Sequence, residues 1–208
     1  MARYLLNFGD SWAHGEGGGK FQKSNYANQL SLATGRQLID LSRPGTSAAH
    51  MILQFQQFVQ ESYCPESDYL ALFFVTAQER QLTFDDSGQA KEIHPGLTDF
   101  NQYYTSMYTD KLGLFNINTV IITLQSLSRY YGIDDRYLLG WQKIKLWPEI
   151  SRSCFYQSGQ TTMMELLGTF DIYECGQDGN TNFIPGDGHP SVAGHTQIAQ
   201  ALYPWIQG

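Results

Sequence analysis

The sequence predicts a single α/β domain over residues 1–208, built as a three-layer α/β/α sandwich around a mostly parallel central sheet. Short apolar segments of strand length alternate along the chain with longer segments of helical periodicity. Several strand segments are apolar at every position, which is typical of strands that are covered on both faces. A length of 208 residues also suits one domain with one sizeable core.

The first half of the chain contains two strands and two helices in alternation. The predicted strands are residues 3–8 and 38–41, and the predicted helices are residues 24–33 and 47–63. Ser24 is a suitable N-cap for the first helix, and Gly35 is a suitable stop. Pro44-Gly45 marks a turn between the second strand and the second helix.

The second half is less regular. Residues 69–75 (YLALFFV) have the length and composition of a buried strand, and residues 119–124 (TVIITL) are predicted as a strand because they are β-branched. Residues 99–112 are predicted as a helix, and a last helix is expected to begin at Pro190 and to end near Ile206. Between about 126 and 184 we expect irregular structure, with a further short strand and a lid over the site.

Composition excludes several classes of partner. The net charge is −7, whereas a nucleic-acid-binding protein would show a basic patch, and anionic membranes would repel this chain. We see neither a secretory signal nor an apolar run long enough to span a membrane. We therefore expect a cytoplasmic protein with no nucleic-acid or membrane partner. The sequence leaves its oligomeric state open.

Cysteine and histidine spacing argues against a metal site. Three cysteines are widely scattered, which fits reduced thiols rather than a disulfide framework: Cys64, Cys154 and Cys175. The candidate ligands of a zinc site are three histidines, but their spacing matches no recognised zinc motif: His14, His189 and His195. We expect no metal and no cofactor.

Two short motifs at opposite ends of the chain supply the three residue types of a nucleophilic triad. Gly9-Asp10-Ser11-Trp12 directly follows the first predicted strand, and Asp187-Gly188-His189-Pro190 precedes the last helix. Ligands of open parallel sheets bind beyond the carboxyl ends of the strands, which is where Ser11 lies. A triad is recognised by its geometry and not by chain order. If the fold brings the two ends together, the protein is a hydrolase.

These motifs, in this order and with Gly45 after the second strand, resemble the SGNH/GDSL hydrolase superfamily. The resemblance covers the architecture of the whole chain and the short motifs in sequence. It implies a flavodoxin-like fold and a serine hydrolase, with the backbone N–H groups of Ser11 and Gly45 and a third-block asparagine as oxyanion donors.

The triad roles also follow from the chemistry of the side chains. A serine hydroxyl is a poor nucleophile until a base removes its proton, and His189 is the candidate base for Ser11. Asp187 would orient the imidazole and stabilise the cation that forms. This aspartate lies two residues before the histidine, whereas the superfamily commonly has three.

The third block departs from the superfamily pattern. In place of Gly-x-Asn-Asp the chain has Thr76-Ala77-Gln78-Glu79-Arg80 after the strand at 69–75. Gln78 replaces the asparagine and is one methylene longer, so its amide is one candidate donor to the oxyanion. The hydroxyl of Thr76 is the alternative. Losing one such donor costs roughly 10²–10³-fold in turnover.

Further side chains near Ser11 are candidates for the substrate pocket. We include Asp10, Trp12, His14 and Arg80 in this set, although Asp10 is better suited to fixing its loop by hydrogen bonds. Arg80 either binds a substrate carboxylate or pairs with a nearby acid. His14 either lines the pocket or is an exposed loop residue, whereas His195 is expected to pack within the last helix.

The leading hypothesis is a serine esterase that removes a small acyl group, such as an O-acetyl group, from a carbohydrate. The carbohydrate is suggested by the abundance of aromatic residues, the acidic surface and the lack of an apolar lid helix suited to lipids. The resemblance to the superfamily also implies a substrate of this kind. An O-acyltransferase would use the same residues. A weakly active or inactive binding or structural protein on the same scaffold, associated with a virus particle, is the alternative that the altered third block motivates.

Overall fold

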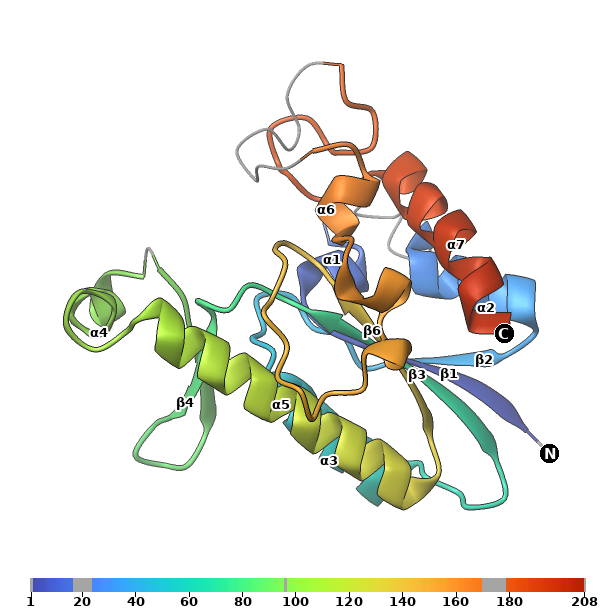
Figure 1. Cartoon of the computed structure of the whole chain (residues 1–208), viewed down its shortest axis with the longest axis horizontal. Helices are drawn as coiled ribbons and strands as arrows, with labels where there is room; N and C mark the ends of the chain where they lie inside the picture. Colours follow the sequence, from blue (N-terminus) through green and yellow to red (C-terminus); the bar gives the residue numbers. More distant parts are fainter. Residues whose placement is uncertain (1, 17–23, 96, 170–178, 208) are drawn as a thin grey trace.

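The computed structural model describes residues 2–16, 24–95, 97–169 and 179–207. Four strands form a parallel sheet in the order β2-β1-β3-β6 (Figure 1). Their bounds are β1 Arg3–Phe8, β2 Gln37–Asp40, β3 Asp68–Val75 and β6 Asp134–Leu139. The predicted parallel sheet is therefore confirmed.

Helices cover both faces of the sheet, as the sandwich prediction requires. The helices α3 (His50–Glu61) and α5 (Asp110–Tyr131) lie on one face (Figure 1). The helices α2 (Tyr26–Thr34) and α7 (Val192–Gln207) lie on the other, together with the short helices α1 (Ser11–His14) and α6 (Met163–Leu166). Each face carries its own cluster of buried apolar side chains.

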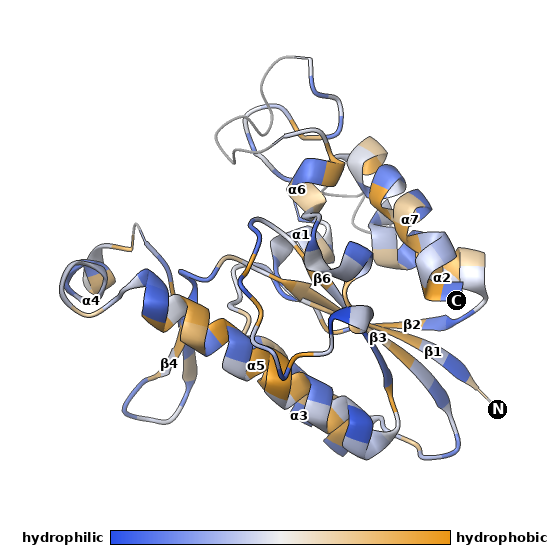
Figure 2. Ribbon diagram, in the orientation of Figure 1, coloured by the Kyte–Doolittle hydropathy of each residue, from blue (hydrophilic) through white to orange (hydrophobic). Residues whose placement is uncertain are grey.

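The central strands are buried because both of their faces pack against helices. In β3 only Asp68 is partly exposed, and the other positions are buried, in keeping with the apolar run of the sequence (Figure 2). The Phe73 ring stacks on Phe8 with 4.7 Å between ring centroids and on Tyr137 with 5.1 Å. Stacked ring pairs of this kind stabilise the core beyond the apolar area that they bury.

The prediction of a strand at residues 119–124 is wrong, because this segment lies inside the 22-residue helix α5. Val120, Ile121 and Leu124 recur with helical spacing and are buried against the sheet. The hydroxyl of Thr123 donates to the carbonyl of Thr119 one turn earlier, at 2.8 Å. Burial of the apolar stripe therefore overrides the β preference of the branched residues.

The predicted helix at 99–112 is also divided. A 3-10 turn at Thr98–Phe100 leads into α4 (Asn101–Ser106), and α5 begins separately at Asp110. The break occurs because Thr109 is an N-cap: its hydroxyl accepts the Leu112 N–H at 3.1 Å.

An antiparallel hairpin that the sequence did not reveal lies between β3 and α4. It consists of β4 (Gln81–Phe84) and β5 (Ala90–Ile93), and with α4 it projects at one end of the molecule (Figure 1). Glu92 ties the hairpin to the start of α3. One of its carboxylate oxygens accepts the Ser47 N–H at 2.9 Å, and the other lies 2.7 Å from His50 Nδ1.

Two helix starts differ from their predictions by one or two residues. The N-cap of α2 is Asn25 rather than Ser24, with its side-chain oxygen 2.8 Å from the Asn28 N–H. Pro190 does not begin the last helix but forms an isolated antiparallel bridge with Phe183, and α7 begins at Val192.

The region predicted as irregular contains more order than expected. Residues up to 131 belong to α5, and β6 is the predicted further strand. After β6 the chain makes 3-10 turns at Arg152–Cys154 and Tyr156–Gly159, and two isolated parallel bridges join it to β6: Tyr137 to Phe155 and Leu139 to Thr162. The centre of the predicted lid, residues 170–178, lies outside the described residues.

Cys64 and Cys154 are half-buried free thiols, whereas Cys175 lies outside the described residues. Within the described ranges, no helix combines the length and the apolar character needed to cross a membrane.

Candidate active site at the carboxyl edge of the sheet

The turn from β1 to α1 carries the predicted nucleophile. Gly9 has φ 143°, and a Cβ there would lie 2.7 Å from Phe74 Cβ, so only glycine permits this close approach to β3. Asp10 is the N-cap of α1, and its Oδ1 accepts the Trp12 N–H at 3.0 Å. Ser11 is therefore the first residue of the helix, where backbone N–H groups have no partner within the helix.

Asp10 is a fully buried carboxylate that joins three strand ends. Its Oδ2 accepts the Thr76 hydroxyl at 2.6 Å and the Trp141 Nε1–H at 3.3 Å. Arg80 Nη1 lies 3.7 Å from the same oxygen. Thr76 follows β3 and Trp141 follows β6, so this carboxylate fixes the loops after β1, β3 and β6 relative to one another.

Gly140 makes the contact of Trp141 with Asp10 sterically feasible. A Cβ at Gly140 would lie 2.4 Å from Phe74 Cε1, which no side chain tolerates without movement. The Gly140 N–H donates to the Val75 carbonyl at 2.9 Å. The chain can therefore run beside β3 for one more residue before Trp141 turns over the site.

The loop that holds Gly45 is attached to the same turn. The Gly9 carbonyl accepts the Arg43 N–H at 3.0 Å and the Thr46 hydroxyl at 3.1 Å. Gly45 itself is exposed, with φ 76°. The two bonds hold the turn that contains Gly45 beside the backbone that leads to Ser11.

The C-terminal motif forms the predicted imidazole–carboxylate pair. His189 Nδ1 lies 2.7 Å from Asp187 Oδ1. The Ile184 N–H donates to the His189 carbonyl at 2.8 Å, and the Asp187 N–H donates to the Ile184 carbonyl at 3.1 Å. This tight turn, with Gly188 at φ 77°, brings the two side chains together at a spacing of two residues.

The fold also brings the N-terminal and C-terminal motifs to one place. His189 Nε2 lies 3.9 Å from the carboxylate of Glu16, and the Glu16 N–H donates to the Ser11 carbonyl at 2.9 Å. No hydrogen bond joins the Ser11 hydroxyl to His189 among the residues that the structure describes. Catalytic hydrogen bonds are often loose in unliganded sites and tighten with substrate.

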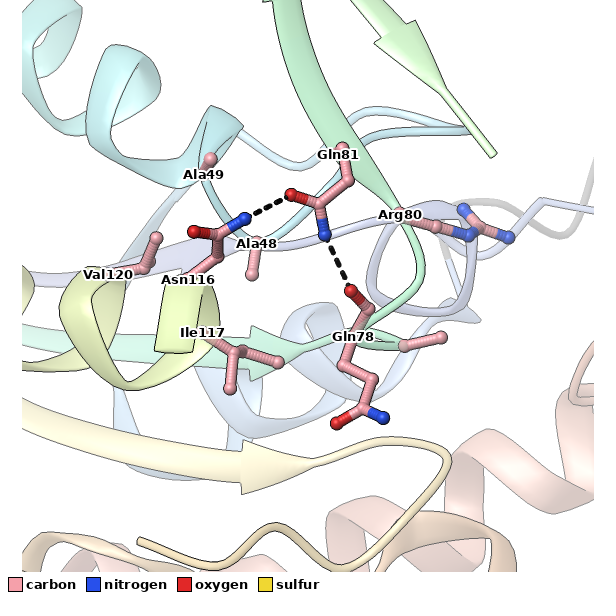
Figure 3. A pocket seen from close by; sticks show the side chains of 9 residues that line it. Ala48, Ala49, Gln78, Arg80, Gln81, Asn116, Ile117 and Val120 are labelled. Carbon is pink, nitrogen blue, oxygen red and sulfur yellow. Dashed lines mark hydrogen bonds between the residues drawn. The ribbon is translucent and has the colours of Figure 1, made fainter. Parts of the chain in front are cut away.

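The altered third block has one free candidate donor. The Thr76 hydroxyl has a single proton, which it donates to Asp10, so in this structure it is not available as an oxyanion donor. The carbonyl of Gln78 accepts Gln81 Nε2 at 2.7 Å, and its side-chain amide points away from that contact (Figure 3). Gln78 also lines a cavity of about 20 Å³ between α3 and α5.

The remaining predicted pocket residues have different surroundings. Asp10 and Trp12 are buried, and Asp10 fixes its loop by hydrogen bonds, as the sequence analysis expects of it. His14 is half-buried at the end of α1, with Nδ1 3.4 Å from the Ser42 hydroxyl. Arg80 Nη1 lies 3.7 Å from the Asp10 carboxylate. His195 is a buried residue of α7.

No group of three or more histidine, cysteine, aspartate or glutamate side chains within the described ranges could hold a metal ion. In particular, the three histidines considered above as zinc ligands do not form such a group there.

No family model matches the sequence, and no curated protein matches it significantly. Solved structures match over nearly the whole chain. TesA aligns with a TM-score of 0.52 and 13% identity, covering 99% of this chain and 98% of its own. The psychrotrophic esterase EstA from Pseudoalteromonas sp. aligns with a TM-score of 0.52 and 16% identity, covering 99% and 97%.

A third similar structure is the acetyl xylan esterase Est2A from the rumen bacterium Butyrivibrio proteoclasticus. It has a TM-score of 0.54 and 14% identity. The alignment covers 100% of this chain and only 64% of that protein. This chain shares the overall α/β fold of these structures, a parallel sheet between two layers of helices. At such low identity the likeness shows the fold alone.

Two residues at this site were not predicted from the sequence. Trp141 lies 131 residues from its partner Asp10, in a segment without a motif. Glu16 lies in a glycine-rich run that resembles a phosphate loop only superficially. The signal that could have found Trp141 is its position shortly after a strand, β6. Because a strand was predicted at residues 119–124 instead, that position was not recognised.

Proposed function

We propose that this chain is a serine esterase that hydrolyses a small acyl ester, specifically an O-acetyl group on a carbohydrate. The observation that carries the proposal is the orientation of His189. Its Nδ1 is held by Asp187 at 2.7 Å, while Nε2 faces the Glu16 carboxylate at the end of the helical turn that begins with Ser11. The carbohydrate ester is chosen because one similar structure is an acetyl xylan esterase.

In the proposed mechanism, His189 accepts the proton of the Ser11 hydroxyl as the oxygen attacks the ester carbonyl. The N–H groups of Ser11 and Gly45 and the amide of Gln78 stabilise the oxyanion. His189 then gives the proton to the leaving alcohol, and an acetyl-serine remains. Water, deprotonated by His189, attacks this intermediate, and acetate leaves as His189 returns the proton to the Ser11 oxygen. Asp187 orients the imidazole and stabilises its charged form throughout.

The test compares Ser11→Ala with the wild type in hydrolysis of p-nitrophenyl acetate and in labelling by a fluorophosphonate. We expect Ser11→Ala to lose labelling and to lose at least about 10³-fold in kcat/KM, because the nucleophile is removed. Ser126→Ala is the matched control, since Ser126 is exposed on α5 and its hydroxyl bonds only its own helix. Equal rates for wild type and Ser11→Ala would refute the serine mechanism.

An inactive binding protein on the same scaffold is the second candidate. It is favoured by the missing hydrogen bond between Ser11 and His189 and by the Thr76 hydroxyl being committed to Asp10. This alternative predicts no fluorophosphonate labelling of the wild type. An acyltransferase would be labelled at Ser11 and would transfer the acetyl group to an added sugar, which product analysis detects.

A further inference from the structure

Arg80 lies beside Asp10, the residue that precedes the candidate nucleophile Ser11, but it is not used by the proposed mechanism. It follows β3 and is one of the residues that line the cavity beside Gln81, and its guanidinium points away from the contact between Gln81 and Asn116 (Figure 3). The guanidinium carbon lies 5.9 Å from the centre of the Trp141 ring, and Nη1 lies 3.7 Å from Asp10 Oδ2. The aromatic face and the carboxylate together fix the direction of this side chain.

The contact with Asp10 does not satisfy Arg80. Both Asp10 oxygens already accept hydrogen bonds, Oδ1 from the Trp12 N–H and Oδ2 from Thr76 and Trp141. At 3.7 Å, Arg80 Nη1 is beyond hydrogen-bonding distance of that carboxylate. Nη1 is buried and has no hydrogen-bond partner among the described residues.

A buried charged donor without an acceptor is costly, and native proteins seldom keep one without a reason. The side chain is 23% exposed, so a ligand can reach the rest of the guanidinium from the surface. The site therefore presents a cation of fixed orientation that lacks some of its hydrogen bonds. This cation contacts Asp10, which directly precedes Ser11 in the sequence.

We propose that Arg80 is a specificity-determining residue that binds a carboxylate on the sugar, so that the preferred substrate is an O-acetylated acidic sugar of the uronic acid type. This inference rests on the proposed esterase function. A planar guanidinium matches a planar carboxylate in two parallel hydrogen bonds. A single cation balances a monoanion, whereas a phosphate dianion would bring a second negative charge toward Asp10.

The first experiment measures kcat and KM for two esters that differ only in the carboxylate: an O-acetylated methyl glucuronide and the matching methyl glucoside. In Arg80→Gln we expect the kcat/KM for the acidic ester to fall at least about tenfold further than that for the neutral ester. The loss should be in KM, because the carboxylate contact is the same in ground and transition states.

Two further variants separate recognition from structure. Arg80→Lys keeps the charge but loses the planar fork, so it should recover only part of the preference. Arg129→Gln is the control, because Arg129 is exposed in the last turn of α5. It should leave both esters unchanged. Equal losses on the two esters in Arg80→Gln would show that Arg80 only holds its loop, and would overturn the proposal.

A binding measurement tests the role of Arg80 even if the protein hydrolyses no ester. If the wild type hydrolyses neither ester, the esterase proposal fails, and titration with unacetylated methyl glucuronide and methyl glucoside still tests Arg80. We expect the glucuronide to bind at least about tenfold more tightly, and Arg80→Gln to abolish the difference. Equal binding of the two sugars by the wild type would contradict the recognition of a carboxylate.

Discussion

The imidazole of His195 is held neutral by its surroundings. It is 4% exposed on α7, its ring lies 6.1 Å from that of Tyr26, and neither ring nitrogen has a hydrogen-bond partner among the described residues. Burial, and secondarily the charge of His189, lower its pKa from 6.5 to about 4. The folded protein therefore takes up this proton only at a pH where the unfolded chain already carries it.

This histidine makes the stability depend on pH. Because the folded pKa is the lower one, its contribution is fully present above pH 6.5 and is lost as the pH falls through about 4. Chemical unfolding of the wild type between those limits should show a loss of about 3 kcal/mol that His195→Leu does not show. His94→Gln, at a more exposed histidine, is the control and should retain the wild-type pH dependence. Parallel curves for wild type and His195→Leu would contradict this prediction.

Residues of the candidate site could be predicted from the sequence where they come shortly after a strand or belong to a short motif. Ser11 and the Asp187–His189 pair were predicted in this way. The partners of Asp10 were not, because Thr76 and Trp141 are 66 and 131 residues away and reach the carboxylate only through the order of the strands. Long-range contacts of this kind depend on the sheet, which the local sequence does not encode.

The loop after β6 depends on the absence of a side chain at Gly140. We expect Gly140→Ala to destabilise the fold by about 2 kcal/mol, because its Cβ would overlap the Phe74 ring. It should also lower esterase activity by displacing Trp141 from Asp10. A double-mutant cycle with Phe74→Leu, followed by urea unfolding, measures the coupling. Strict additivity of the two losses would show that the overlap with Phe74 is not the cause.

The helix α5 offers a test of the corrected element boundary. Thr109→Ala removes the N-cap oxygen that accepts the Leu112 N–H and should cost about 1 kcal/mol in the free energy of unfolding. Thr119→Ala is the matched control, because this exposed threonine lies inside the helix, where alanine is preferred. It should be neutral or slightly stabilising. A larger loss for Thr119→Ala than for Thr109→Ala would contradict the helical assignment.

Elements with one consistent local signal were predicted well. In β3 the apolar run and the β-branched and aromatic composition agree with burial on both faces. At residues 119–124 the same composition predicted a strand, because the helical spacing of Ile117, Val120, Ile121 and Leu124 is visible only over a longer window. The hairpin of β4 and β5 gave no signal because its strands have four residues each and one largely wet face.

At the scale of the whole molecule, that hairpin is an appendage to the sandwich. Outside its own β4–β5 pairing, a main polar attachment is the Glu92 carboxylate, which bonds Ser47 N–H and His50 at the start of α3. The groove between the hairpin, α4 and α5 has an open volume of about 360 Å³, so packing there is incomplete. An element held by few contacts opens at lower cost than the core.

Amide hydrogen exchange of Glu92→Gln tests this attachment. The neutral amide weakens both contacts, so amides in β4 and β5 should exchange at least about fivefold faster, while those in β1 and β3 should not change. Glu61→Gln is the control, because Glu61 is exposed at the end of α3. Uniform acceleration across the sheet would mean that the hairpin opens only with global unfolding.

The two bridges from β6 to residues 155 and 162 also matter for how the molecule behaves in a concentrated solution. A sheet of four strands has two outer borders, and a long, unpaired border invites pairing with another molecule. Along the edge strand β6, the segment that contains residues 155 and 162 forms no strand of its own. It nevertheless pairs with β6 at two positions where another molecule could otherwise pair. The opposite border, β2, has only four residues and ends in Asp40. Neither border therefore offers a long template for self-association into fibres.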